Sequence, residues 1–110
     1  MQHNKSKLIH DALLTCEELK TFTKCRTLEE LESDRGLQLI VERLFEVLGE
    51  ALYRLRNLDE AAFVQLTDGA RIIGTRNILA HGYDIVDHLL LWDAIRLGLP
   101  KLEEELAKLL

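Results

Sequence analysis

Proline and cysteine are scarce in this sequence, and no low-complexity run is present. Among 110 residues there is one proline, and there are two cysteines, Cys16 and Cys25. The cysteines are separated by eight residues and form neither a C-x-x-C pair nor, with a second pair, a zinc site. The composition is that of a globular chain rather than a disordered one. We therefore expect a folded protein with two reduced thiols, as is usual in the cytoplasm.

Long apolar runs and an excess of positive charge are also missing. No apolar run approaches the roughly 18 residues of a membrane span, and the N-terminus has no signal-peptide pattern. The formal net charge of −5 argues against a protein that coats nucleic acid without specificity, because that mode of binding needs many phosphate contacts from Lys and Arg. The expected protein is cytoplasmic and makes no membrane contact, and any cationic site on it is local.

Helical spacing of apolar residues is the main feature that is present. Apolar residues recur at intervals of three and four, and no alternating pattern lies between turn residues. We predict an all-α fold, a bundle of four main helices plus one or two short helices, in a single domain over residues 1–110. A leucine-rich chain of this size leaves apolar surface that a second copy can bury, so a homodimer is expected.

The first half of the chain contains two long helical stretches, over about residues 5–24 and 35–57. In the first stretch, the residues expected to face the core are Leu8, Ala12, Leu19 and Phe22. Helix-start signals lie between the stretches at Thr27 with Glu30, and at Ser33 or Asp34. The second stretch has the clearest separation of an apolar and a polar side.

Gly49 and Glu50 lie on or beside the polar side of the second stretch. A glycine inside a helix weakens it by about 1 kcal/mol relative to alanine, so Gly49 indicates that another element packs closely there. Glu50 borders this polar side, where a solvated face with ordinary ion pairs explains it.

The second half contains a short helix that Asp59 can cap, then a helix from about Arg71 to Ala80 that should stop at Gly82. Asp84 or Asp87 can cap the next helix. That helix carries Leu89, Leu90, Leu91 and Trp92 in succession, which is typical of a central helix or of a subunit contact. Gly98 is expected to end it, and Pro100 to lie in the first turn of a last helix.

One locally cationic window lies in this acidic chain. Between Asp68 and Asp84 there are three basic residues, Arg71, Arg76 and His81, and no acidic residue. On a continuous helix Arg76 and His81 would point about 140° apart. They can converge on one ligand if the helix ends near the histidine.

The side chains in this window suit phosphate chemistry. Arg76 has a planar, permanently charged fork that can hold a phosphodiester through two hydrogen bonds. His81 can accept or donate a proton near neutral pH. Together they could cleave RNA without a metal: His81 takes the proton of a 2′-hydroxyl, which attacks the adjacent phosphorus, while Arg76 stabilises the charge on the phosphate oxygens. The acid for the leaving group would be Tyr83, water or a group of a second subunit.

Other interpretations of the same residues differ in how well their spacing fits. "GARIIGTR" has Thr75 where a phosphate-binding loop needs lysine. The four histidines show no metal-ligand spacing, so no metal site is predicted. A cysteine–histidine nucleophile would need a buried cysteine to reach His81. An arginine and a histidine near a helix C-terminus are also favoured by the helix dipole alone, and residue types do not separate that interpretation from an active site.

A family resemblance adds to this reading. Residues 76–83, "RNILAHGY", fit the pattern R-N-x-x-x-H-x-Y, and "RLFEVLGEALYRL" at residues 43–55 contains a G-E-A step. Together with "YDIVDHLLLWDAIRLGLPKL", these segments resemble the HepT-like toxins of the HEPN superfamily from about Gly36 onward. The resemblance implies a helical dimer with its arginine–histidine motifs in a cleft between subunits.

The same resemblance implies roles for individual residues. Arg76 and His81 would be catalytic in a metal-independent endoribonuclease that needs no cofactor, and Asn77 would orient the site with Glu50 close to it. The protein would be the toxin of a type VII-like toxin–antitoxin system. Its partner would be an MntA-like minimal nucleotidyltransferase that transfers AMP to Tyr83 and so silences cleavage of RNA, for which tRNA is the candidate.

A second function uses the same residues. The chain could be a non-catalytic helical module that binds nucleotide or partner and serves a minimal nucleotidyltransferase. An intact Arg76 and His81 favour the nuclease, whereas the net acidity and the lack of a second histidine in the motif favour the module.

Overall fold

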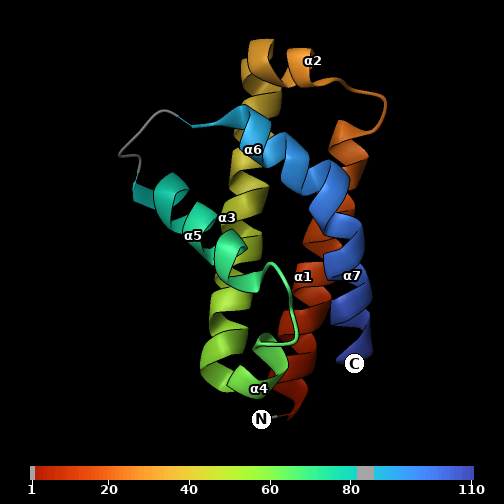
Figure 1. Ribbon diagram of the computed structural model, residues 1–110, viewed down its shortest axis with the longest axis vertical. Helices are drawn as coiled ribbons and strands as arrows, with labels where there is room; N and C mark the ends of the chain where they lie inside the picture. The colour runs from red at the N-terminus through yellow and green to blue at the C-terminus, as the bar shows by residue number, and fades with distance from the viewer. Residues whose placement is uncertain (1, 82–85) are drawn as a thin grey trace.

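The computed structural model describes residues 2–81 and 86–110, and within these ranges every regular element is a helix (Figure 1). In chain order the elements are α1 (Gln2–Thr23), α2 (Leu28–Ser33), α3 (Arg35–Leu58), α4 (Glu60–Phe63), α5 (Gly69–His81), α6 (His88–Asp93), the π-helical η1 (Ala94–Gly98) and α7 (Leu99–Lys108). The main helices are α1, α3, α5 and the continuous arm α6–η1–α7, and α2 and α4 are short. The predicted all-α bundle is confirmed.

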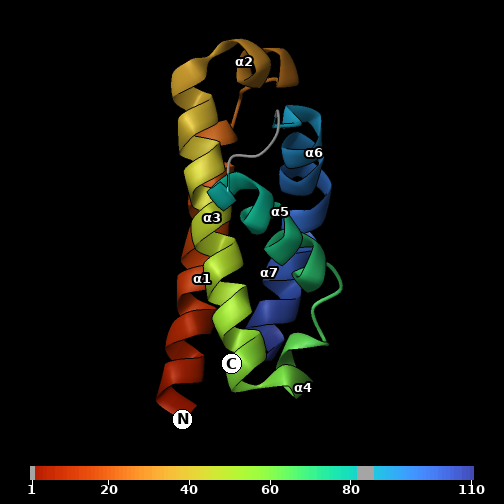
Figure 2. The ribbon, with the colours of Figure 1, turned by 90° about the vertical axis from the view of Figure 1, so that its left-hand side faces the viewer.

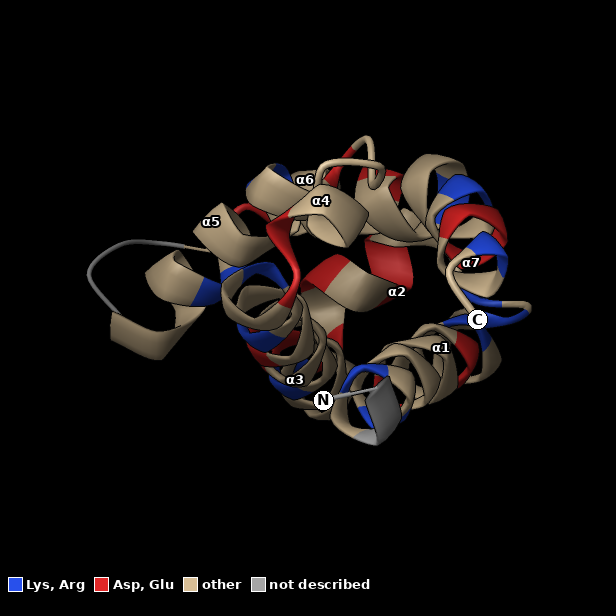
Figure 3. Cartoon of the chain, turned by 90° about the horizontal axis from the view of Figure 1, so that it is seen from below, with Lys and Arg blue, Asp and Glu red and all other residues tan. Residues whose placement is uncertain are grey.

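Helix α3 is the centre of the bundle. It packs against α1 on one side and α5 on the other, and α7 packs against α1 (Figures 1 and 2). Viewed from below, the helices follow one another around the bundle in the order α5, α3, α1, α7 (Figure 3). The largest fully buried side chains of α1 and α3 are Ile9, Leu19, Phe45, Leu48, Leu52 and Leu55. This core fixes the rotation of α3 and thereby decides which of its residues face α5.

The inward face of α1 differs in part from the prediction. Ala12 and Leu19 are buried as expected, but Phe22 is 45% exposed. The buried positions of this last turn are Leu19 and Thr23, and a residue next to Thr23 in sequence is turned about 100° away from it. Hydrophobicity alone therefore misplaced Phe22.

Side-chain caps begin the helices where the sequence indicated. Asp34, Asp59 and Asp87 each accept a hydrogen bond from the backbone N–H three residues later, at 3.1, 3.0 and 3.2 Å. Thr27 and Glu30 form the predicted reciprocal capping box at the start of α2. The two other predicted signals, Gly82 as a stop and Asp84 as a cap, lie outside the described residues.

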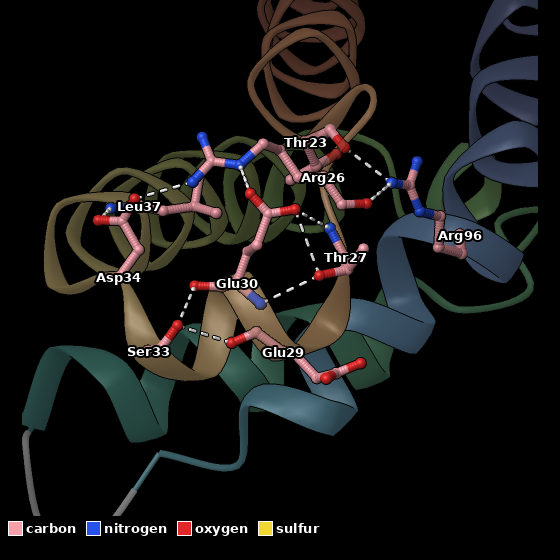
Figure 4. A network of polar contacts seen from close by, with 9 residues as sticks. All are labelled: Thr23, Arg26, Thr27, Glu29, Glu30, Ser33, Asp34, Leu37 and Arg96. Carbon is pink, nitrogen blue, oxygen red and sulfur yellow. Dashed lines mark hydrogen bonds and ion pairs between the residues drawn. The ribbon is translucent and has the colours of Figure 1, made fainter.

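Polar contacts lock the corner between α1, α2 and α3 to the C-terminal arm (Figure 4). Arg26 bridges Glu30 at 2.9 Å and Asp34 at 2.8 Å. The backbone N–H of Leu37 and the Arg26 guanidinium hold the pKa of Asp34 below its ordinary value. Arg96, from η1, donates to the backbone carbonyl oxygen of Thr23 at 2.7 Å and to that of Arg26 at 3.1 Å.

The C-terminal arm corrects one prediction and confirms another, since Pro100 lies in the first turn of α7 as expected. Gly98 does not end a helix, because its backbone is helical and the chain continues directly into α7. Leu99 donates to the carbonyl of Ala94, five residues back. An interior proline ring meets the carbonyl four residues before it in an α-helix, and we attribute the π turn that precedes Pro100 to that conflict.

The run of apolar residues in α6 does not make that helix central. Leu91 is 2% exposed, but Leu89 and Leu90 are 48% and 46% exposed. The other interpretation of this run, a subunit contact, stays a prediction. Among the described residues, no helix is both long and apolar enough to cross a membrane.

Candidate functional site

Helix α5 brings Arg76 onto the side of α3. Gly69, Ile72 and Ile73 of α5 are buried, and Arg76 continues the same stripe because residues three or four apart share a helix face. The side chain of Arg76 is 28% exposed. It therefore lies at the edge of the α3–α5 interface, with its head within reach of a ligand.

Gly49 of α3 provides the space that Arg76 occupies. A Cβ atom at position 49 would overlap the Cβ of Arg76, and it would lie 2.8 Å from the Cγ of Arg76 and 3.2 Å from the carbonyl oxygen of Ile72. Gly49 is buried in this contact. The close approach inferred from a glycine inside a helix is confirmed, and the element that approaches is the one that carries the motif.

The Arg76 guanidinium is held by two oxygen atoms and lies over one aromatic ring. Its Nη2 donates to Oε2 of Glu50 at 3.0 Å, and its Nη1 donates to Oδ1 of Asn77 at 2.7 Å. Glu50 also lies 3.5 Å from Nε of Arg54. The Cζ atom of Arg76 is 5.7 Å from the centre of the Tyr53 ring. The structure thus brings Arg76, Asn77 and Glu50 together, and adds Tyr53, which the sequence analysis did not single out.

Phosphate binding remains open to Arg76 in this arrangement. Each terminal nitrogen of a guanidinium carries two N–H groups, and Glu50 and Asn77 each accept from a different one. The remaining N–H of each nitrogen can donate to a phosphodiester. Glu50 and Asn77 therefore fix the direction of the fork without using all of its donors.

His81 is the last residue of α5 and is exposed. In an α-helix, residues 76 and 81 point about 140° apart and lie about 7.5 Å apart along the axis. The described part of α5 reaches His81, and the predicted stop of the helix comes after it. The residues that follow, including Gly82 and the predicted modification target Tyr83, lie outside the described part of the chain.

A groove opens beside Arg76 between α1, α3 and α5. Its volume is about 560 Å³, and its charged lining includes Arg43, Glu46, Glu50, Arg54 and Arg76. Arg43 lies 3.6 Å from Glu46, and Arg54 lies 3.5 Å from Glu50. The groove therefore mixes both signs of charge.

Other chemistries have little support in the described residues. No group of three His, Cys, Asp or Glu side chains in residues 2–81 and 86–110 is arranged to hold a metal ion. Burial raises the pKa of the Cys16 thiol to about 12. A thiol with that pKa is almost wholly protonated at neutral pH and is a poor nucleophile.

Comparison with known proteins places the chain among RNase-like relatives. A family model described as "Ribonuclease HepT-like" matches residues 12–109. Three curated proteins of Methanocaldococcus jannaschii, each named "Putative RNase", are similar to this chain. The first, MJ1380, is 29% identical over 97 residues, which are 88% of this chain and 88% of that protein. The other two, MJ0125 and MJ1216, are each 26% identical over 102 residues, which are 93% of this chain and 87% and 84% of those proteins. No solved structure matches at comparable significance.

Proposed function

Because the chain belongs to the HepT-like ribonuclease family, we propose that it is a metal-independent endoribonuclease whose site is built on Arg76 and His81. The observation that supports this most is the fixed position of Arg76. Its Cβ packs where α3 has Gly49, and Glu50 and Asn77 orient its fork. A guanidinium held in this way is preorganised for a phosphate, so little reorganisation is needed in the transition state.

In the proposed reaction His81 takes the proton of a ribose 2′-hydroxyl. The 2′-oxygen attacks the adjacent phosphorus and the bond from phosphorus to the 5′-oxygen breaks. The products are a 2′,3′-cyclic phosphate and a 5′-hydroxyl. Arg76 stabilises the added charge on the non-bridging oxygens, and Asn77 and Glu50 are positioning residues. One positioned proton-transfer group contributes about 10²- to 10⁴-fold, so the leaving oxygen needs an acid of its own, from Tyr83, water or a second subunit.

We propose a homodimer because the two side chains leave α5 in different directions. Arg76 faces α3, whereas His81 is carried on another side of α5. A second copy placed against α5 would let the two motifs share one cleft. The exposed Leu89 and Leu90 of α6 are apolar surface for such a contact.

We further propose that the protein is the toxin of a type VII-like toxin–antitoxin system in the cytoplasm. Expression of the wild type alone is expected to slow growth, and His81→Ala is expected to abolish the effect. His10→Ala is the matched control, because His10 is also an exposed histidine but belongs to α1 and not to the motif. Growth arrest that persists in a folded His81→Ala variant would contradict the assigned role of His81.

The proposed antitoxin is an MntA-like minimal nucleotidyltransferase that transfers AMP to Tyr83. Tyr83 lies seven residues after Arg76 in the sequence, and an added phosphate would bring negative charge near the arginine that must bind RNA. Co-expression with the transferase is expected to add the mass of AMP to the wild type and none to Tyr83→Phe. A toxin that is neutralised while Tyr83 stays unmodified would indicate inhibition by binding alone.

A further inference from the structure

Tyr53 links the proposed catalytic arginine to a second one. It lies on α3 one turn after Gly49, and its ring is under two guanidinium groups: the Cζ of Arg76 at 5.7 Å and that of Arg56 at 5.2 Å from the ring centre. Tyr53 is 36% exposed. Arginine and aromatic side chains in alternation are the pattern with which proteins hold unpaired nucleic-acid strands.

Arg56 differs from the neighbouring arginines in its side-chain partners. The other arginines of α3 and α5 each have a carboxylate within 4.0 Å; they are Arg35, Arg43, Arg54, Arg71 and Arg76. Arg56 has none among the described residues and contacts two rings instead, the second being Phe63 at 5.7 Å. Its charge is therefore available to a phosphate.

The position of this pair suits the nucleotide next to the cleaved bond. The Tyr53 ring contacts the Arg76 guanidinium directly. If Arg76 binds the scissile phosphate, the base of an adjacent nucleotide can reach the Tyr53 ring. A base inside a duplex already has both faces stacked on its neighbours and has no face left for the Tyr53 ring. Attack by a 2′-oxygen in line with the leaving oxygen also requires a flexible, unpaired strand.

We propose that Tyr53 and Arg56 form a subsite for single-stranded RNA, in which the Tyr53 ring stacks on one base and Arg56 binds the adjacent phosphate. This proposal rests on the proposed function, because the scissile phosphate is taken to lie on Arg76. It assigns specificity for unpaired RNA to α3, outside the R-N-x-x-x-H-x-Y segment. Tyr53 and Arg56 bind substrate and take no part in proton transfer.

The test is binding of a 2′-O-methyl oligonucleotide, which has no 2′-hydroxyl to attack and stays intact. A single 2-aminopurine is moved along the strand, and its fluorescence falls where the base stacks. Wild type is expected to quench the probe strongly at one position. Tyr53→Leu should lose that quenching and bind about tenfold more weakly, as is usual when a stacking ring is removed, whereas Tyr53→Phe should behave as wild type.

Two further variants separate stacking from a general loss of fold or charge. Arg56→Gln leaves the Tyr53 ring in place and should reduce the salt dependence of binding by about one phosphate contact. Phe22→Leu removes an exposed ring of α1 and should change nothing. The proposal is overturned if wild type does not bind the strand, if Tyr53→Leu binds and quenches like wild type, or if Tyr53→Phe is as weak as Tyr53→Leu.

The outcome is separable from that of the proposed function, because the oligonucleotide cannot be cleaved. Quenching that depends on Tyr53 in a protein that cleaves no RNA would keep the subsite and remove the nuclease. If the wild type cleaves RNA but Tyr53→Leu binds the oligonucleotide normally, the nuclease is kept and the subsite is removed.

Discussion

Arg76→Ala is expected to lower the rate of RNA cleavage by about 10²- to 10³-fold, the usual effect of removing one group that stabilises transition-state charge. Its effect on stability should be small, because its ion pair with Glu50 is partly exposed, with side chains 28% and 35% accessible, and such pairs contribute about 0–1 kcal/mol. The measurement is single-turnover cleavage together with thermal unfolding.

Arg71→Ala is the matched control for this variant. Arg71 is on the same helix and is exposed, and its ion pair with Asp68 is long, at 3.8 Å. The Arg71→Ala variant should cleave RNA at the wild-type rate. Equal losses in Arg71→Ala and Arg76→Ala would mean that α5 contributes only general positive charge, and the assigned role of Arg76 would be wrong.

Gly49→Ala is expected to lower the free energy of unfolding by about 1–3 kcal/mol, as overpacking does. The loss should remain although alanine is better than glycine in a helix by about 1 kcal/mol. The added methyl group meets the Cβ of Arg76 and the backbone of Ile72, neither of which can rotate away. Since α5 must shift, cleavage should fall as well. Chemical denaturation and the cleavage assay measure the two effects.

Gly74 supplies a control of opposite sign. It is exposed in α5, and a Cβ atom there has no neighbour within 4 Å. Gly74→Ala should therefore stabilise the protein by about 0.5–1 kcal/mol through helix propensity alone. If Gly49→Ala is also stabilising and fully active, α3 and α5 do not make the close contact on which the position of Arg76 depends.

Local chemistry explains why most of the helices could be predicted. Caps act within three residues, so Asp34, Asp59 and Asp87 revealed helix starts without any knowledge of the fold. Gly49 could be interpreted because a glycine inside a helix has no local benefit. The end at Gly98 was predicted wrongly, since the π turn before Pro100 keeps the arm helical.

The environment of Arg76 required tertiary information. Glu50 has Arg54 four residues later and could have been an ordinary helix-surface pair, yet it contacts both Arg54 and Arg76. Whether Glu50 reaches Arg76 in addition to Arg54 depends on the rotation of α3 and on where α5 crosses it. The contact of Tyr53 with Arg76 has the same origin. No pattern within α3 reveals that this ring contacts an arginine of another helix.

The most direct test of the central claim is cleavage of a tRNA mixture by the purified protein in EDTA, with Tyr83 confirmed unmodified by mass. We predict that the wild type cleaves and leaves 2′,3′-cyclic phosphate ends, whereas His81→Ala and Arg76→Ala do not cleave at a comparable rate. No cleavage by the folded wild type, or cleavage at the same rate by His81→Ala, would contradict the account. The first of these results would favour a non-catalytic module that serves the nucleotidyltransferase.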